Sequence, residues 1–320
     1  MAFIFVLSAK SHISQFSFDN ITLHHRGGKG MKGPKFEEGD LPISIVSARP
    51  QDYVLFLTDT GRAYRVQAND IHLPENWKTT KARHVNQILK DLQPGDRIVD
   101  MLAMKPGLVN KDDAYLFIAT KKGLIKKVSV QNELSKFTRS GKRVISFREG
   151  DGYGGACFGK DHNFVCLVTS DGQLVRFNAS SIRASGRSSE GVLGVKLRDS
   201  AKLVSILVGS DGNNVFLVSS MGLGKQVDMN RFRASKRGNY GMRSFWLRDG
   251  DKVACASLVN PSKSLDLLLL TNRNKLNRFK VDEFRVSGRG SMGIKAFSVN
   301  KEESEEVIDC CYVSIVNTYY

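Results

Sequence analysis

The 320-residue sequence contains no apolar run near the roughly 18 residues that a membrane-spanning helix needs. The apolar stretch at residues 2–7 is too short for a signal peptide, and no basic region precedes it. The five cysteines, at positions 157, 166, 255, 310 and 311, are odd in number and form no CxxC pair. We therefore expect a soluble, cytosolic protein whose thiols are reduced.

Catalytic and metal-binding motifs are also missing from the sequence. The six histidines, at positions 12, 24, 25, 72, 84 and 162, have neither HExxH nor any paired-ligand spacing. No GxSxG or P-loop is present, and no helix pattern follows the glycine-rich stretches 27–33 and 150–159. We expect no metal, no cofactor and no enzymatic activity of the isolated chain.

Acidic residues are scarce. The chain has 32 Asp and Glu against 48 Lys and Arg, which gives a net charge of +16 and an isoelectric point of about 9.7. The excess is uneven, +7 over residues 114–160, +1 over 52–106 and −4 over 299–320. A basic protein of this kind indicates a polyanionic partner, most often nucleic acid, because binding releases counterions from phosphates.

A unit of about fifty residues recurs six times. Each copy has a short apolar run, then Thr or Ser, two residues and a turn residue. The turn residues are at positions 11, 61, 123, 172, 222 and 274, so the steps are 50, 62, 49, 50 and 52. The longest step is in the second unit, where residues 73–81, with Pro74 and Trp77, interrupt the register.

Each turn is followed by a second β-type run, usually with a cation, so the two runs predict a β-hairpin. A loop with an arginine comes next, and Gly or Arg follows four residues later, at Gly30, Arg143, Gly191, Gly241 and Gly293. Residues 24–30 in the first unit read His-His-Arg-Gly-Gly-Lys-Gly. Glycine lets the main chain approach a partner closely, and two cations beside it suit an anion. The alternative is architectural, with the repeated cation tying neighbouring loops together.

Helix signals are weak, and the best candidate, residues 80–92, has scattered apolar positions. Short apolar runs between Gly, Asn, Asp and Ser predict an all-β protein. We predict a six-bladed, propeller-like closed ring of four-stranded blades that spans residues 1–320 as a single domain. Its units are approximately residues 1–51, 52–113, 114–160, 161–210, 211–261 and 262–320. The runs 3–7 and 311–316 should meet where the ring closes.

The combination of the RGGKG sequence and six repeats resembles the C-terminal domain of the bacterial DNA gyrase A protein. That family has the signature Q-R-R-G-G-R/K-G in its first repeat, and this chain matches the last five positions, residues 26–30. His24 and His25 replace the usual Gln and Arg. The repeat pattern, as in residues 117–127, is similar over essentially the whole chain.

The resemblance implies a β-pinwheel whose basic rim bends and wraps duplex DNA without sequence preference, supporting negative supercoiling by gyrase. It implies a non-catalytic module of an ATP-dependent type II topoisomerase, with the remainder of the gyrase A protein and the gyrase B protein as partners. It also implies a cytoplasmic, nucleoid-associated protein, and we expect the isolated domain to be monomeric. The expected DNA-binding residues are Arg26, Gly27, Gly28, Lys29, Gly30, Lys32, Lys35, Lys126, Lys127, Arg139, Lys142, Arg143, Arg176, Arg187, Lys225, Arg237, Arg278, Arg289 and Lys295.

Two other functions are compatible with the sequence. The C-terminal domain of the topoisomerase IV A protein is a related family, but it generally has a degraded or absent box and often fewer blades. A protein-binding propeller with a basic face is the alternative from a different class. No recognition-helix, zinc-finger or RNP-type motif is visible.

Overall fold

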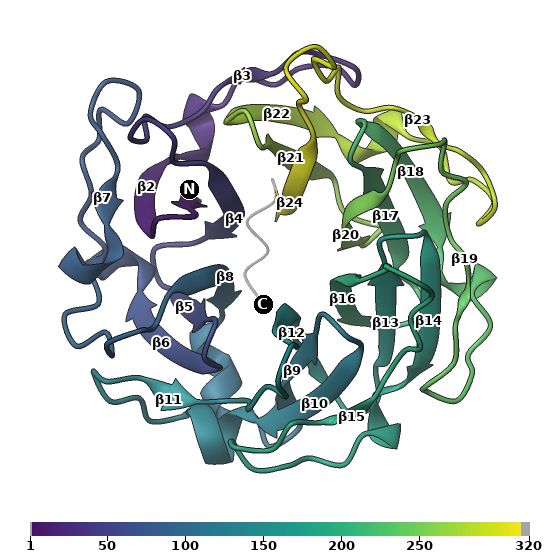
Figure 1. The fold of residues 1–320 in the computed structure, drawn as a ribbon, viewed down its shortest axis with the longest axis horizontal. Helices are drawn as coiled ribbons and strands as arrows, with labels where there is room; N and C mark the ends of the chain where they lie inside the picture. Colours follow the sequence, from purple (N-terminus) through teal and green to yellow (C-terminus); the bar gives the residue numbers. More distant parts are fainter. Residues whose placement is uncertain (1, 315–320) are drawn as a thin grey trace.

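The fold is a closed ring of six four-stranded antiparallel sheets (Figure 1), seen in a computed structural model that describes residues 2–314. This is the six-bladed, all-β architecture that the repeats predict. The strands nearest the ring axis are β4 (Pro42–Ala48), β8 (Ile98–Met104), β12 (Tyr153–Lys160), β16 (Leu203–Gly209), β20 (Val253–Val259) and β24 (Val307–Ser314).

The next strand outward begins each hairpin: β1 (Phe3–Ser8), β5 (Tyr53–Thr58), β9 (Ala114–Thr120), β13 (Phe164–Thr169), β17 (Asn214–Ser219) and β21 (Leu265–Thr271). Its partner completes the hairpin: β2 (His12–Ser17), β6 (Arg62–Gln67), β10 (Leu124–Ser129), β14 (Gln173–Asn178), β18 (Leu223–Asp228) and β22 (Lys275–Lys280). The outermost strands have two residues each: β3 (Met31–Lys32), β7 (Arg83–His84), β11 (Lys142–Arg143), β15 (Val192–Leu193), β19 (Met242–Arg243) and β23 (Ile294–Lys295).

The hairpin turns have one construction in all six units. Every predicted turn residue has a positive φ, between 56° at Asn274 and 92° at Gly123. The Thr or Ser three residues earlier accepts a hydrogen bond from the main-chain nitrogen just after the turn, as between Thr58 Oγ1 and Arg62 N at 3.0 Å. The other five bonds measure 3.0–3.2 Å. The repeated Thr or Ser is therefore a cap for the turn.

The outermost strand of each blade comes from the next unit along the chain. β7 of the second unit pairs with β2, and β3 of the first unit pairs with β22 of the last. Each unit thus gives three strands to its own blade and one to the blade before. The β3–β22 pairing closes the ring.

Six apolar cores lie between neighbouring blades, and each takes side chains from both. One joins Phe5 of β1 to Phe56 of β5, and another joins Phe216 of β17 to Phe279 of β22. The core at the closure joins Ile4 and Val6 to Leu268 and to Val313. The two terminal runs therefore meet at the closure as predicted, although residues 315–316 lie outside the described residues.

Residues 80–92 contain no α-helix. They form β7 and the short 3₁₀ segment η3 (Val85–Gln87), because pairing of β7 with β2 overrides their weak helical pattern. The remaining short helical segments are η1 (Phe18–Asn20), η2 (Ala68–Asp70), η4 (Pro106–Asn110), η5 (Val130–Leu134), η6 (Ala179–Ser181), η7 (Met229–Arg231) and η8 (Val281–Glu283). The extra loop of the second unit reaches the closure core, where Trp77 is buried and stacks on Phe16 at 4.4 Å.

Two carboxyl groups lie close together near the ring axis. Asp100 on β8 accepts hydrogen bonds from Ser44 Oγ at 2.8 Å and from the Tyr153 hydroxyl at 2.6 Å. Asp309 on β24 accepts one from Ile45 N at 2.8 Å. Burial, followed by repulsion from Asp100, raises the pKa of Asp309 to about 8.

Candidate nucleic-acid interface

The rim of the ring carries a repeated junction of three consecutive units. We number each blade after the unit that gives it three strands. A junction contains the first residue of the strand that is third from the ring axis in one blade, the outermost strand that the next unit gives to this blade, and the arginine-containing loop of the unit after that. At blade 2 these are Arg62, Arg143 and Arg187, and at blade 4 they are Gln173, Arg243 and Arg289. Strand exchange is what brings the three units to one point.

The blade 2 junction forms a hollow of about 380 Å³. Lys142 lines it beside the three arginines, and two acids nearby offset part of the charge. Arg187 Nε lies 2.9 Å from Glu133 Oε2, and Arg62 Nε lies 3.6 Å from Asp96 Oδ2. Burial, then the positive charge of Arg187, lowers the pKa of Lys142. The surrounding cations thus add to the effect of burial, and Glu133 opposes it.

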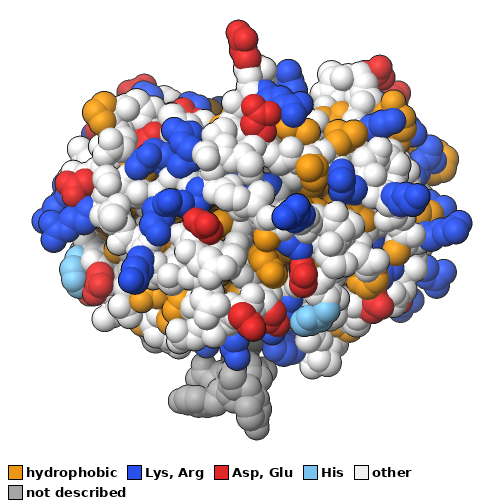
Figure 2. Space-filling view, turned by 90° about the horizontal axis from the view of Figure 1, so that it is seen from below, with side chains coloured by type: hydrophobic (Ala, Val, Ile, Leu, Met, Phe, Trp, Pro, Cys, Tyr) orange, Lys and Arg blue, Asp and Glu red, His pale blue; other side chains and the backbone are white. Residues whose placement is uncertain are grey.

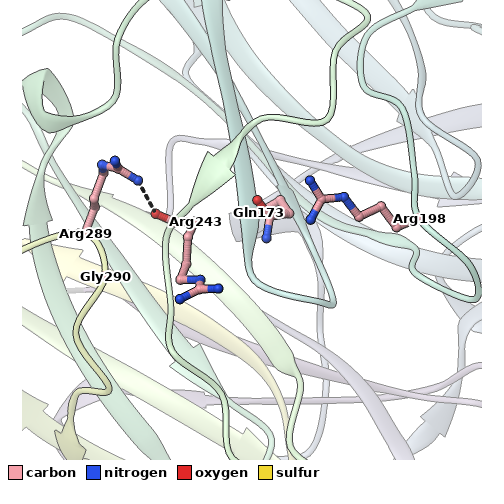
Figure 3. A pocket seen from close by; sticks show the side chains of 5 residues that line it. All are labelled: Gln173, Arg198, Arg243, Arg289 and Gly290. Atoms are coloured by element: carbon pink, nitrogen blue, oxygen red, sulfur yellow. Dashed lines mark hydrogen bonds between the residues drawn. The ribbon is translucent and has the colours of Figure 1, made fainter.

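The blade 4 junction forms a hollow of about 510 Å³ lined by Gln173, Arg198, Arg243, Arg289 and Gly290. In Figure 3 the Arg198 guanidinium points toward Gln173, and Arg289 reaches the main chain of Arg243, to whose oxygen Nη1 donates at 3.4 Å. Within residues 2–314 no ion pair joins any of these three arginines to an acid. Three guanidinium groups are thus free to meet an anion.

The other junctions vary in charge. Blade 5 pairs Leu223 with Lys295, next to the loop that holds Arg26, and blade 6 pairs Lys275 with Lys32. Blade 1 pairs His12 with His84. At blade 3 the junction is apolar, with Leu124 opposite Leu193, and Arg237 Nη1 donates to Leu193 O at 2.9 Å. The rim is therefore cationic at blades 2, 4, 5 and 6, apolar at blade 3 and lined by a histidine pair at blade 1.

The RGGKG segment lies against the last blade. Gly27 N donates to Ala296 O at 2.8 Å, and a Cβ at Gly30 would come within 2.5 Å of Leu276 O. The glycines we expected to contact DNA thus have their close approach to the protein main chain, and only the Arg26 and Lys29 side chains project into solvent. The segment leads into β3, whose pairing with β22 closes the ring, and it presents two cations where the first and last units meet.

Four of the expected DNA-binding cations are buried: Lys126, Lys127, Arg176 and Lys225. Lys225 Nζ donates to the main-chain oxygens of Gly288, Arg289 and Ser291 at 2.9–3.0 Å. Lys126 Nζ does the same with Gly186, Arg187 and Ser189 at 2.6–3.3 Å. Burial lowers the pKa of both lysines to about 8. These two side chains hold the basic loop of the next unit, which is the architectural alternative for the repeated cation.

The residue after each of these two lysines, and its counterpart in the other units, also binds the main chain of the next unit. Its side chain donates to a main-chain oxygen in or beside the short helical segment of the next unit. The donors are Arg65 to Leu134, Lys127 to Ala179, Arg176 to Phe232, Gln226 to Phe284 and Arg278 to Ile21, at 2.9–3.2 Å. Because neutral Gln226 replaces a cation in this series, the position requires a donor rather than a charge.

Between its turn residue and the glycine before the outermost strand, the third unit is one residue shorter than the first, fourth, fifth and sixth units. Gly141, not Arg143, is the counterpart of Gly191 and Gly241, because its Cβ would lie 2.8 Å from Ala63 O and theirs 2.6–2.7 Å from the equivalent oxygens. Arg139 therefore does not occupy the loop-arginine position, and Arg143 belongs to the outermost strand β11.

The remaining expected cations lie at the surface. Arg26, Lys29, Lys32, Lys35, Arg139, Arg143, Arg187 and Lys295 are exposed, and Lys142, Arg237, Arg278 and Arg289 are half-buried. Figure 2 shows the edge of the ring, where Lys and Arg side chains are spread over the surface and outnumber Asp and Glu. The sequence did not point to Arg62, Arg198 and Arg243, because the junctions form only when the outermost strand of one unit joins the blade before it.

Over the described part of the chain, no helix has the length and apolar character to cross a membrane. Residues 2–314 also contain no group of three or more His, Cys, Asp or Glu placed to hold a metal ion.

The fold and site define a class: a closed six-bladed β-propeller with exchanged outer strands and a basic rim. The family model described as "DNA gyrase C-terminal domain, beta-propeller" matches residues 52–71, 114–152, 163–210, 213–260 and 265–310. Because these segments make up more than half of the sequence, the chain belongs to this family.

Individual proteins agree with this assignment. The chain is 29% identical over 305 residues to the DNA gyrase A protein of Deinococcus deserti, and 29% identical over 303 residues to that of Staphylococcus aureus. Each alignment covers 94% of this chain but only 37% and 33% of the relatives, so the chain spans about a third of their length.

Solved structures share the fold. A DNA gyrase A C-terminal domain aligns with a TM-score of 0.85 and 22% identity, covering 97% of this chain and 99% of that one. The C-terminal domain of DNA topoisomerase IV aligns with a TM-score of 0.67 and 17% identity, covering 98% and 94%.

Proposed function

We propose that the chain binds duplex DNA along its rim, without sequence preference, and bends it around the ring. The observation that carries the proposal is the rim junction, where three consecutive units place cations around one hollow. Phosphates of a duplex that follows the edge would meet these hollows in turn. Base readout is not needed for such binding, because phosphate contacts position DNA without reading its sequence.

Bending has an energetic cost that several contacts can offset. Smooth bending of a 20–30 base-pair segment costs about 1–6 kcal/mol. Phosphate contacts on several blades can together offset this cost. The number of contacts can be measured, because each neutralised phosphate steepens the decline of log K with log salt concentration by about 0.9. We expect a slope that corresponds to at least about six contacts.

In a longer protein like the gyrase A relatives, this module would support negative supercoiling together with the rest of the gyrase A protein and with the gyrase B protein. The module itself would be non-catalytic, and the protein would be cytoplasmic and associated with the nucleoid. The RGGKG sequence favours gyrase over topoisomerase IV, because it is the family's box with two substitutions.

Electrophoretic mobility shift with duplexes of about 20 and about 150 base pairs tests the proposal. Wrapping requires a length that reaches several junctions, so affinity per molecule should rise steeply with duplex length. Weak binding that is indifferent to length would instead indicate a propeller that binds protein partners, and the proposal would fail.

A further inference from the structure

Two large aromatic side chains are exposed on the rim beside β19. Tyr240 is 45% exposed and Trp246 is 56% exposed. They lie on either side of the blade 4 junction, whose arginines have no acidic partner within residues 2–314. Exposed aromatic rings next to unpaired cations require an explanation beyond packing.

The rings and the hollow form one continuous surface, because two arginines belong to both. The Arg198 guanidinium lines the hollow and lies 5.3 Å from the centre of the Tyr240 ring. The Arg243 guanidinium also lines the hollow and lies 5.4 Å from the Trp246 ring. A phosphate bound in the hollow would therefore have an aromatic face within reach on each side.

The main chain that carries both rings is held by hydrogen bonds. Trp246 N donates to Ser291 O at 3.0 Å, and its neighbour Phe245 is buried in the core between blades 4 and 5. Beside Tyr240, Asn239 Oδ1 accepts from Gly241 N at 2.7 Å and Asn239 Nδ2 donates to Lys236 O at 2.6 Å. On a main chain held in this way, a Tyr or Trp ring has only its two χ angles left to order when a flat partner stacks on it.

The other units do not have these rings. Counted from the outermost strand, Ser140 and Ser146 occupy the same two positions at the blade 2 junction. That junction has its own three arginines and so provides the matched comparison within the molecule. The counterparts in the remaining units are Lys29 and Lys35, Glu190 and Lys196, Met292 and Ser298, and Lys81 and Gln87.

We propose that this edge of blade 4 binds an unpaired stretch of a DNA strand, with phosphate in the arginine-lined hollow and bases stacked on Trp246 and Tyr240. A basic groove combined with aromatic platforms is the arrangement that binds single strands without sequence preference. Duplex DNA cannot satisfy it, because its bases are already stacked inside the helix. This activity goes beyond the proposed duplex binding and does not depend on it.

Intrinsic tryptophan fluorescence gives a direct test. The chain has two tryptophans, and Trp77 is buried against Phe16, so quenching by an oligonucleotide reports Trp246. We expect saturable quenching by an oligothymidine of about 12 nucleotides and little change with a duplex of the same length. Absence of quenching by the single strand, or equal quenching by the duplex, would overturn the proposal.

Variants complete the test. Trp246→Ala should weaken binding of the labelled oligothymidine about tenfold and change binding of a long duplex less than about twofold. Equal losses for both DNAs would contradict a single-strand site. The double substitution Ser140→Tyr and Ser146→Trp at the blade 2 junction should strengthen oligothymidine binding, and this gain cannot result from misfolding. Failure to gain, in a variant with an unchanged melting temperature, would count against the proposal.

Discussion

Gly30 of the first unit lies against the main-chain oxygen of Leu276 in the last, so closely that a Cβ there would be 2.5 Å from that oxygen. This contact is part of the pairing that closes the ring. The same glycine ends the RGGKG segment, so closure of the ring and presentation of Arg26 and Lys29 depend on one short stretch of chain.

The first prediction concerns this closure. Gly30→Ala should destabilise the protein by more than the ~1–2 kcal/mol of a left-handed alanine, because the clash with Leu276 O adds to the strain at φ 69°. Gly39→Ala is the matched control, since Gly39 has φ 76° and nothing within 4 Å of an added Cβ. Urea unfolding of both variants measures the difference. Equal losses of stability in the two variants would mean that the contact between residue 30 and Leu276 tolerates the added methyl group.

A second prediction separates rim cations from other surface charge. Arg143→Gln with Arg187→Gln should weaken binding of a long duplex and lower its salt slope by about 2, because two phosphate contacts disappear. The control replaces Lys111 and Lys263 with Gln, two exposed lysines in the connections β8–β9 and β20–β21. Binding isotherms at several salt concentrations check this. A similar loss of affinity in both double variants would indicate only general electrostatic attraction between the basic protein and DNA.

The buried lysines should behave in the opposite way. Lys225→Met removes the donor to three main-chain oxygens and should cost about 1–3 kcal/mol of folding stability. Binding of the folded variant to duplex DNA should change less than about twofold. Lys295→Met, on the exposed strand β23, should weaken binding and leave the melting temperature unchanged. A strong loss of affinity in folded Lys225→Met would contradict this prediction, because DNA binding would then need Lys225 itself or the exact position of the loop that it holds.

The axial carboxyl pair predicts a pH dependence of stability. The pKa of Asp309 is raised in the folded state, so between about pH 4 and about pH 8 the folded protein binds more protons than the unfolded chain. Its stability should therefore fall as the pH rises through this window. Asp309→Asn, which cannot ionise, should show a smaller fall between pH 5.5 and pH 8 in thermal unfolding. Wild-type and Asp309→Asn curves with the same slope across the window would contradict the assignment.

The blade count and the turns could be predicted from sequence because they depend on local rules. The Thr or Ser, the two following residues and the turn residue form one hydrogen-bonded turn, and six copies of it mark six hairpins. The outermost strands could not be found in this way. A two-residue strand such as Lys142–Arg143 has no periodicity of its own, and only pairing with the preceding unit defines it.

The candidate site was harder to predict for the same reason. Counting charge by unit gave the second unit only a small excess, yet Arg62 of that unit shares a hollow with Arg143 and Arg187 from the next two. Buried Lys225 and exposed Lys295 look alike in sequence. Only packing distinguishes a lysine that holds a loop from one that faces solvent.

The change in linking number of a plasmid tests most directly whether duplex DNA bends around the rim. Nicked plasmid is religated with increasing amounts of the domain, and topoisomers are then resolved on gels. If duplex DNA follows the curved rim, the linking number should shift in proportion to bound domain, and the Arg143→Gln, Arg187→Gln variant should shift it less at equal occupancy. Binding that saturates with no change in linking number would contradict the account.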